Sequence, residues 1–372
     1  MAKDKRLNIG LLLDDTLDTP DGVQQYVLTL GRWLSNRGHT VHYIVGASKR
    51  MDIDNMHPLA KVLRLKFNGN RVGTPLPVSM RKVRRLLAEL DLDVLHVQMP
   101  YSPFFAAKVI RAADPKTKIV GSFHVLPNGW LESLGARMLG WALYRSRKRI
   151  DICISNTHNT SIFYHSAWGV ASEIIPNPVN LDRFYQAQAR PHNSPKKVVF
   201  LGRFVERKGA LNLVRGIALL PSSIKAEFHL GGKGPLLQKA KDLSRDLGLE
   251  GVITFDGFID ESDKPAYLAQ ADIAIFPSTG GESFGISLIE PMAAGVPVVL
   301  AGRNPGYESV MHNYDELLFH SAEPQKIADI LQYWLVADSK LIKNTASSLA
   351  QHVKQYDIDK VVGQKILEIY TL

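Results

Sequence analysis

The sequence predicts an α/β protein built from two doubly wound domains that face a central cleft. Its 372 residues, 45% of them apolar, are enough for two cores of ordinary size. Short, wholly apolar runs alternate with amphipathic segments, which is typical of parallel strands covered by helices on both faces. The alternation stops at a polar, proline-containing stretch, 186–196, and then starts again. We therefore expect one domain over 1–186 and another over 187–356, with a C-terminal helix over about 357–372 packing back on the first.

The expected elements follow from these runs. The first half has six candidate strands: Asn8–Leu13, Thr40–Val45, Val62–Lys66, Val94–Gln98, Lys118–Phe123 and Ile150–Ser155. The second half has six more: Lys197–Gly202, Glu227–Gly231, Val252–Phe255, Ile273–Pro277, Val296–Leu300 and Leu317–Phe319. Helical periodicity covers Val23–Asn36, Lys208–Leu220, Pro235–Leu247, Lys264–Gln270, Phe284–Ala294, Pro324–Ala337 and Ile342–Leu372, the last with a break near Tyr356.

Composition narrows the class of protein. A formal charge of +9 favours an anionic partner such as a phosphorylated substrate, a nucleic acid or an acidic membrane surface. The single cysteine, Cys153, lies in an apolar run, so we expect a buried core residue and a reducing, cytoplasmic environment. No window approaches the roughly 18 apolar residues of a spanning helix. The first apolar run meets Asp14 and Asp15 at once, which favours a buried strand over a signal peptide.

Three loops of the second half suit a phosphate group. Gly202 ends one strand and is followed by Arg203 and Lys208. The forked guanidinium of arginine and the compact ammonium group of lysine together fit a diphosphate. A glycine-rich turn around Gly232 follows the next strand. A third loop, 278–283, precedes the helix expected from Phe284, whose free N–H groups can hold an anion. Two glutamates, Glu282 and Glu290, flank this helix start with seven residues between them.

These motifs resemble the donor site of glycosyltransferase family four, in particular the phosphatidylinositol mannosyltransferases. The similar segments are "GRFVERKG" at 202–209, "GESFGISLIEPMAAGVPVV" at 281–299 and "IPNPV" at 175–179, with Pro178 where the family usually has glycine. The resemblance covers essentially the whole chain. It implies the GT-B fold and a retaining transfer of a hexose from a nucleotide-diphosphate sugar.

The resemblance also implies roles for individual residues. Arg203 and Lys208 neutralise the donor diphosphate, Glu282 holds hydroxyls of the donor sugar, and Glu290 holds the ribose. The catalytic residues it indicates are His124, Arg203, Lys208 and Glu282. The donor-binding residues it indicates are Gly22, Gly202, Arg203, Lys208, Gly232, Glu282, Ser283, Phe284, Gly285 and Glu290.

The acceptor is expected on the first domain. The loop after the first strand contains Asp18, Gly22 and Gln24, and it resembles the family's "GGVQ" loop with Asp21 replacing the first glycine. Gly22 lets a ligand approach the backbone closely. His124 follows a strand and matches the family's histidine beside the reacting sugar, where it would donate or accept a hydrogen bond. We assign Asp18, Gly22 and Gln24 to acceptor binding.

A basic amphipathic segment, Ser79–Leu90, indicates what carries the acceptor. Its apolar residues gather on one helical face, and Arg81, Lys82, Arg84 and Arg85 gather on the other with no acid interleaved. Such a face favours an anionic membrane surface, at about 1 kcal/mol per cation. It also resembles the basic helix of phosphatidylinositol mannosyltransferases. Nucleic acid is not expected, because no stacking aromatic residues lie among the cations.

The sequence thus predicts transfer of a hexose, foremost mannose from GDP-mannose, to a membrane lipid such as phosphatidylinositol, at the inner face of the membrane. A soluble acceptor, a UDP-sugar donor and a non-catalytic nucleotide-sugar or membrane-binding module stay open as alternatives, as does the oligomeric state. An oxidoreductase is disfavoured, because the sequence has no GxGxxG motif. We expect no tightly bound cofactor and no protein metal site, although Mg²⁺ can accompany a diphosphate. The three Asp-x-Asp motifs, at 52–54, 91–93 and 357–359, are interpreted as structural.

Overall fold

The computed structural model describes residues 6–19, 21–67, 70–127, 130–187 and 195–372. The chain divides into two compact units, Met1–Pro178 with Asp357–Leu372, and Val179–Tyr356. The boundary therefore lies eight residues before the expected one at 186/187. The reason is that Val179, Leu181 and Phe184 pack into the core of the second unit.

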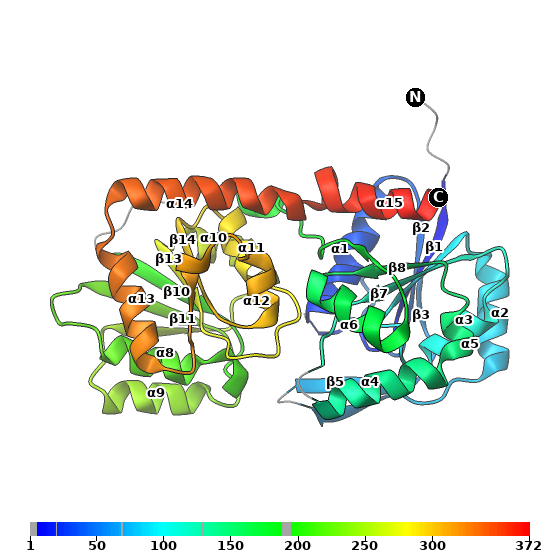
Figure 1. Cartoon of the computed structure of the whole chain (residues 1–372), viewed down its shortest axis with the longest axis horizontal. Coiled ribbons are helices and arrows are strands. Elements are labelled where there is room, and N and C mark those ends of the chain that lie inside the picture. Colours follow the sequence, from blue (N-terminus) through cyan, green and yellow to red (C-terminus); the bar gives the residue numbers. More distant parts are fainter. Residues whose placement is uncertain (1–5, 20, 68–69, 128–129, 188–194) are drawn as a thin grey trace. The chain divides into compact units, whose positions relative to one another are not determined.

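The first unit, which carries α1, α6 and α15 in Figure 1, contains a parallel seven-stranded sheet in the order β3-β2-β1-β6-β7-β8-β9. Its elements are β1 Asn8–Leu13, α1 Gly22–Asn36, β2 Thr40–Val45, β3 Met56–Pro58, β4 Val62–Phe67, β5 Asn70–Pro75, α2 Met80–Leu90, β6 Val94–Gln98, α3 Ala106–Ala112, β7 Lys118–Phe123, α4 Trp130–Ala142, α5 Tyr144–Arg147, β8 Ile152–Ser155, α6 His158–Trp168, β9 Glu173–Ile174, the π-helix η4 Ile358–Val362 and α15 Gly363–Thr371. Its central strands are apolar on both faces, as parallel strands between helix layers require.

One expected strand of this sheet does not belong to it. Residues 62–67 form β4, which pairs antiparallel with β5 in a separate two-stranded hairpin. The sheet edge is instead taken by the short strand β3, which pairs with β2 and was not expected. An apolar run predicts an extended segment, but it does not specify the pairing partner, and a short connection favours an antiparallel neighbour over a crossover.

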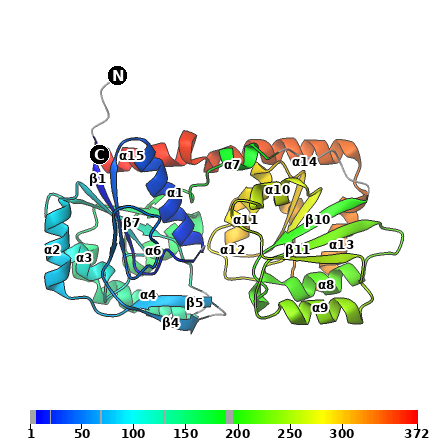
Figure 2. The same ribbon diagram turned by 180° about the vertical axis from the view of Figure 1, so that it is seen from behind.

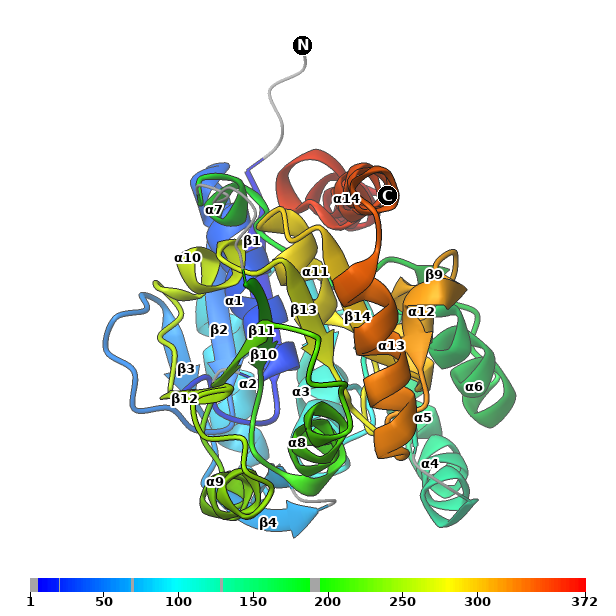
Figure 3. The same cartoon turned by 90° about the vertical axis from the view of Figure 1, so that its left-hand side faces the viewer.

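The second unit repeats this architecture with a parallel six-stranded sheet in the order β12-β11-β10-β13-β14-β15. Its elements are α7 Asp182–Tyr185, β10 Lys196–Leu201, η1 Glu206–Lys208, α8 Ala210–Ala218, β11 Ala226–Gly231, α9 Leu237–Asp246, β12 Ile253–Gly257, α10 Lys264–Ala269, β13 Ile273–Phe276, α11 Ile286–Ala293, β14 Val298–Gly302, α12 Pro305–Val310, η2 Asp315–Leu317, β15 Leu318–Phe319, α13 Pro324–Val336, α14 Ser339–His352 and η3 Val353–Tyr356. Helix α8 contacts α9 and α13, whereas α11 contacts α10, α12 and α14 (Figure 3).

The C-terminal segment belongs to the first unit. Asp357 breaks the helical run after η3 and caps η4 by accepting hydrogen bonds from the N–H groups of Asp359 and Lys360 at 2.8 and 3.3 Å. Helix α15 then lies beside α1 (Figure 2). Its Tyr370 hydroxyl meets Nδ1 of His96, inside the sheet, at 2.6 Å. The side chains of Val362, Ile366 and Ile369 are buried in the same core as Leu11 and Leu13 of β1.

Ile366 tests how much α15 stabilises the first unit. Its side chain is fully buried, so I366A removes apolar contacts and leaves a cavity, and we expect the free energy of unfolding to fall by about 3 kcal/mol. Urea titration followed by circular dichroism measures the loss. The neighbouring exposed residue supplies the control, K365A, which should change the midpoint little. Equal effects of the two variants would contradict burial of this helix face.

Candidate active site

Three loops of the second unit meet at the carboxyl edge of its sheet. They follow β10, β11 and β13, which are adjacent in the sheet order, so their first residues lie side by side. Gly232 joins two of these loops in close contact. Its φ is +135°, and a Cβ there would lie 1.8 Å from the Gly202 carbonyl oxygen. Only glycine fits this position, and the predicted glycine-rich turn therefore brings two backbones together.

The central feature of the site is the carboxylate of Glu282. Its Oε1 atom lies 2.6 Å from Nη1 of Arg207 and 2.8 Å from Nζ of Lys208. The same oxygen accepts a hydrogen bond from the Ser278 hydroxyl at 2.8 Å. Each of the three charged side chains is less than one fifth exposed. The site thus holds two cations and one anion in a largely desolvated cluster, with every described contact of the carboxylate on Oε1.

Burial and charge act against each other on the pKa values of this cluster. Burial alone would raise the pKa of Glu282, but the charges of Lys208 and Arg207 outweigh it and lower that pKa. Burial would likewise lower the pKa of Lys208, and Glu282 raises it instead. The cluster is therefore fully ionised at neutral pH.

Backbone contacts fix the loop that carries the two cations. The Arg207 carbonyl accepts hydrogen bonds from the N–H of Thr279 at 2.9 Å and the hydroxyl of Ser278 at 3.1 Å. Gly209 has a φ of +70°, and a Cβ there would come within 1.9 Å of the Pro277 carbonyl oxygen. The loops after β10 and β13 are thus joined through backbone groups as well as through charge. Arg203 lies in the same loop, partly buried.

Helix α11 begins later than expected. It starts at Ile286, two residues after the predicted start, because Phe284 is buried against the ring of Tyr356 and Gly285 has a non-helical φ of −125°. Ser283 is partly exposed just before the helix. The first N–H groups of α11 have no partner within the helix, which makes this start a favourable place for an anion.

Glu290 projects from α11 and is ion-paired with a lysine that the sequence did not point to. Its Oε1 lies 2.8 Å from Nζ of Lys264, and the same Nζ lies 2.6 Å from Glu261. Glu290 and Lys264 are about 15% exposed. Charge alternates along Glu290, Lys264, Glu261 and Arg183, the last contact being 3.3 Å. A carboxylate held this way presents a fixed acceptor to hydroxyl groups.

The carboxyl edge of the first sheet carries neutral, buried polar side chains. Nε2 of His124, after β7, lies 2.7 Å from Oε1 of Gln98, at the end of β6. The ring of Tyr26 lies 4.7 Å from that of His124. Within the described ranges, five buried polar atoms of this edge have no hydrogen-bond partner: Asp14 Oδ1, Tyr26 OH, Gln98 Nε2, His124 Nδ1 and Asn177 Oδ1. Buried polar groups are rarely left unpaired, so several of them at one sheet edge are an unusual feature of this unit.

Burial controls the charge of this edge. Burial lowers the pKa of His124 to about 4, and the neighbouring Asn177 opposes this. Burial also raises the pKa of Asp14 to about 7. His124 is neutral at pH 7, and its contact with the Gln98 oxygen assigns the proton to Nε2.

The three residues of the predicted acceptor loop, Asp18, Gly22 and Gln24, have different surroundings. Gln24 is buried in α1, and Gly22 is the exposed first residue of that helix. Asp18 accepts hydrogen bonds from the Ser48 hydroxyl at 2.6 Å and from the Lys49 N–H at 3.0 Å, so it holds the loop after β2. The sequence did not single out Tyr26 or Gln98, and it gave no role to Asn177 of the "IPNPV" segment; the three lie far apart in the sequence.

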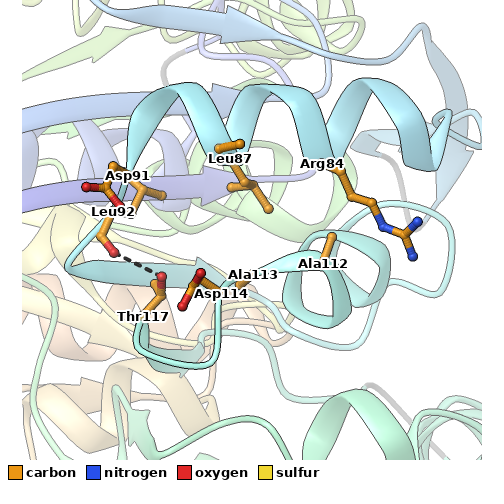
Figure 4. Close-up of a pocket in the computed structure, with 9 residues that line it drawn as sticks. Arg84, Leu87, Asp91, Leu92, Ala112, Ala113, Asp114 and Thr117 are labelled. Carbon is orange, nitrogen blue, oxygen red and sulfur yellow. Dashed lines mark hydrogen bonds between the residues drawn. The ribbon is translucent and has the colours of Figure 1, made fainter.

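Helix α2 presents the expected basic face. Val83 is fully buried, whereas Arg81, Lys82, Arg84 and Arg85 are exposed. One expectation was wrong: this face does contain an acid, because Glu89 lies one turn after Arg85 and pairs with it at 2.8 Å. Arg84 lines a pocket with Asp91, Asp114 and Thr117 (Figure 4). Leu92 and Thr117 precede β6 and β7, so the pocket is at the opposite sheet edge from His124.

The Asp-x-Asp carboxylates have structural partners. Asp52 pairs with Arg50 at 2.5 Å, Asp91 with Lys116 at 2.7 Å, and Asp357 caps η4. In the part of the chain that the structure describes, no group of three or more histidine, cysteine or acidic side chains is arranged to hold a metal. Over the same residues, no helix combines the length and apolar character needed to cross a bilayer.

Comparisons with known proteins agree with this geometry. The family described as "Glycosyltransferase Family 4" matches residues 20–183, and "Glycosyl transferases group 1" matches residues 182–351. A phosphatidyl-myo-inositol mannosyltransferase of Mycolicibacterium smegmatis is 28% identical, over 98% of this chain and 93% of that protein. One from Mycobacterium tuberculosis is 31% identical, over 79% of this chain and 77% of that protein.

Solved structures support the same fold. A glycosyltransferase from Rickettsia africae superimposes with a TM-score of 0.77 at 17% identity, covering 98% of each chain. Anabaena HepE, in complex with UDP and glucose, gives a TM-score of 0.73 at 17% identity, covering 99% of this chain and 100% of that one. Fold and site together define a glycosyltransferase of the GT-B class. The chain belongs to glycosyltransferase family 4, and the relatives named above place it beside the phosphatidyl-myo-inositol mannosyltransferases.

The depressed pKa of His124 predicts how stability depends on pH. The folded pKa of about 4 is below the ordinary value of 6.5, so below about pH 6.5 only the unfolded chain takes up this proton. The contribution of neutral His124 is present above pH 6.5 and is lost as the pH falls toward 4. Between pH 7 and pH 5, the wild-type protein should lose roughly 2 kcal/mol more unfolding free energy than H124Q.

Urea titrations at pH 7, 6 and 5 measure this difference. H165Q replaces an exposed histidine of α6 and is the matched control, for which we expect the wild-type dependence. Parallel curves for wild type and H124Q would show that the ring is not held neutral by burial.

Proposed function

We propose that this protein is a retaining mannosyltransferase that moves mannose from GDP-mannose to a membrane lipid of the phosphatidylinositol type. The observation that carries the proposal is the Glu282–Lys208–Arg207 cluster beside the start of α11. Its charges suit a sugar diphosphate. The choice of mannose and of the lipid is supported by the names of the curated relatives, one of them a GDP-mannose-dependent phosphatidylinositol monomannoside mannosyltransferase of Mycobacterium tuberculosis, 28% identical over 95% of this chain.

The diphosphate is the natural partner of the positive charge. Lys208 and Arg207 contact one carboxylate in a partly dehydrated site, and Arg203 lies in the same loop. The N–H groups at the start of α11 point to the same region. Together these groups stabilise the charge that develops on the diphosphate as the sugar leaves. Mg²⁺ can bind to the diphosphate itself and enter the site with the donor, without a protein ligand.

The two carboxylates hold two parts of one donor. The Oε2 atom of Glu282 accepts hydrogen bonds from hydroxyls of the sugar, since the described contacts of this group all go to Oε1. Glu290, oriented by Lys264, accepts from the ribose hydroxyls. Lys264 is thus a positioning residue for Glu290, and Arg207 is one for Glu282.

The resemblance to glycosyltransferase family four implies transfer with retention of the anomeric configuration. The bond between the anomeric carbon and the diphosphate oxygen breaks, and the acceptor oxygen bonds to the same face of that carbon. The acceptor proton goes to the leaving diphosphate oxygen. His124, neutral at pH 7, contributes a hydrogen bond to the donor sugar and does not act as a nucleophile.

The neutral polar edge of the first unit suits a polyol acceptor. Unpaired atoms of Tyr26, Gln98, His124 and Asn177 supply donors and acceptors without charge. The exposed cations of α2 favour a peripheral position on the anionic, cytoplasmic face of a membrane. Two alternatives have some support: a UDP-sugar donor, because HepE is seen with UDP, and a soluble acceptor, for which the basic face of α2 would be ordinary surface.

Arg203 provides the catalytic test. Removing its charge with R203A should lower turnover by at least about a hundredfold, because transition-state charge on the diphosphate loses a partner. The thermal midpoint should stay within a few degrees, since the side chain is partly exposed. R215A, on the outer face of α8, is the matched control and should keep wild-type turnover. A wild-type rate for R203A would remove the donor assignment.

The donor and acceptor can be identified separately. We expect GDP-mannose to raise the thermal midpoint, since a ligand at about 100 times its Kd adds roughly 2.7 kcal/mol of stability, and UDP-glucose to raise it less. Radiolabelled mannose should then appear in phosphatidylinositol and not in free inositol. A larger shift with UDP-glucose would favour the alternative donor. Transfer to free inositol alone would favour the soluble acceptor, and binding without transfer or donor hydrolysis would indicate a non-catalytic module.

A further inference from the structure

Helix α4 of the first unit exposes its large apolar side chains, whereas an ordinary surface helix turns such side chains toward the core. Five large apolar side chains are exposed, and each shows about half or more of its surface: Trp130 74%, Leu131 64%, Leu134 49%, Met138 65% and Trp141 84%. At about 100° per residue, the five lie within one arc of about 100°. The sides facing the protein are instead formed by Ser133, Ala136 and Gly140, which are buried or partly buried. Two views place α4 at the periphery of the unit (Figures 1 and 3).

This orientation is fixed by packing and is not the result of loose docking. A Cβ at Gly140 would lie 2.6 Å from the Trp168 ring of α6, so the helices approach closely at this point. The indole N–H of Trp168 donates a hydrogen bond to the Ala136 carbonyl at 2.9 Å. Small residues and the partly buried Leu139 therefore dock α4 on α6, and the five exposed apolar side chains point away from the protein. A contiguous exposed apolar surface of this kind marks an interaction site.

The charges around this face indicate its partner. Arg137 is exposed at the edge of the apolar arc, and Arg145 and Lys148 are exposed just beyond the helix. The only acid within α4, Glu132, is partly buried on the inner side. An apolar strip with tryptophans at both ends and cations at its rim matches the boundary between head groups and acyl chains of an anionic bilayer. A protein partner would not require that the charged residues around the apolar strip all be cations.

We propose that α4 inserts its outer face, with Trp130 and Trp141, into the interfacial layer of an anionic membrane. The inference rests on the proposed function for the choice of a bilayer, because a lipid acceptor has to be reached from one. It adds an apolar anchor to the electrostatic attraction that the α2 cations supply. These two contributions are separate, since α2 exposes charge and α4 exposes apolar surface.

The tryptophans make insertion directly observable. The chain has five tryptophans, and Trp33, Trp168 and Trp334 are at most 5% exposed. A fluorescence change on adding vesicles therefore reports on α4. With vesicles of 70% phosphatidylcholine and 30% phosphatidylglycerol, we expect a blue shift and quenching by brominated acyl chains. An unshifted spectrum from protein that pellets with these vesicles would overturn the insertion of α4.

A double variant tests whether the face drives binding. W130S/W141S should lower the vesicle partition coefficient by about tenfold or more, because two interfacial tryptophans are lost. Y333S/V336S replaces two exposed apolar residues of α13 and should partition like wild type. Both substitutions in α4 are at exposed positions, so the thermal midpoint should be unchanged. Wild-type partitioning of W130S/W141S would overturn the proposal. So would a wild-type protein that is dimeric in solution and becomes monomeric with L134E, because this face of α4 would then be covered by a second copy of the chain.

The result can be separated from the proposed function. Vesicle binding requires neither donor nor transfer, so it can succeed even if no mannose is moved. If transfer does occur, W130S/W141S should keep wild-type rates with phosphatidylinositol in detergent micelles and lose rate with phosphatidylinositol in vesicles. Loss in both forms would place the tryptophans in the catalytic machinery and overturn an anchoring role.

Discussion

The Glu282 carboxylate lies between Lys208 and Arg207, and this contact holds together the loops that form the donor side. A buried ion pair contributes little net stability, because desolvation offsets attraction. Its value here is positional. If the carboxylate were absent, two cations less than one fifth exposed would repel each other, and the loop after β10 would lose this ionic contact with the loop after β13. The same loops are also joined at Gly209 and Ser278, so charge and backbone geometry require the same arrangement.

In the proposed function, the two units use the carboxyl edges of their sheets to bind different kinds of ligand. In the second unit the edge is charged and paired, which suits a diphosphate that must be bound and then stabilised as it leaves. In the first unit the edge is neutral and contains unpaired polar atoms, which suits hydroxyl groups that need directional contacts. Burial is the common cause: it keeps His124 neutral because no nearby charge opposes it, whereas Glu282 stays charged because two cations do.

The sequence predicted the fold and the motif residues, because these depend on local pattern. Apolar alternation located most strands within two residues, and the glycines around 232 indicated the turn that the structure confirms. It could not predict Arg207 or Lys264, because both are surface-type residues whose roles come from partners 75 and 26 residues away. It also gave β4 to the wrong sheet, since a strand pattern carries no information on pairing. The assignments of site residues to sugar, ribose and acceptor stay predictions.

Helix α4 shows why burial adds information that periodicity cannot supply. Its apolar spacing predicts one apolar face, but the same pattern fits a helix facing a core and a helix facing a membrane. The decisive residues are the small ones, Ala136 and Gly140, because they let α6 approach on their side and leave the tryptophans outside. Charge on α2 acts over roughly a Debye length and weakens with salt, whereas apolar contact acts only at the surface and does not. A chain with both can be drawn to a membrane by one and retained by the other.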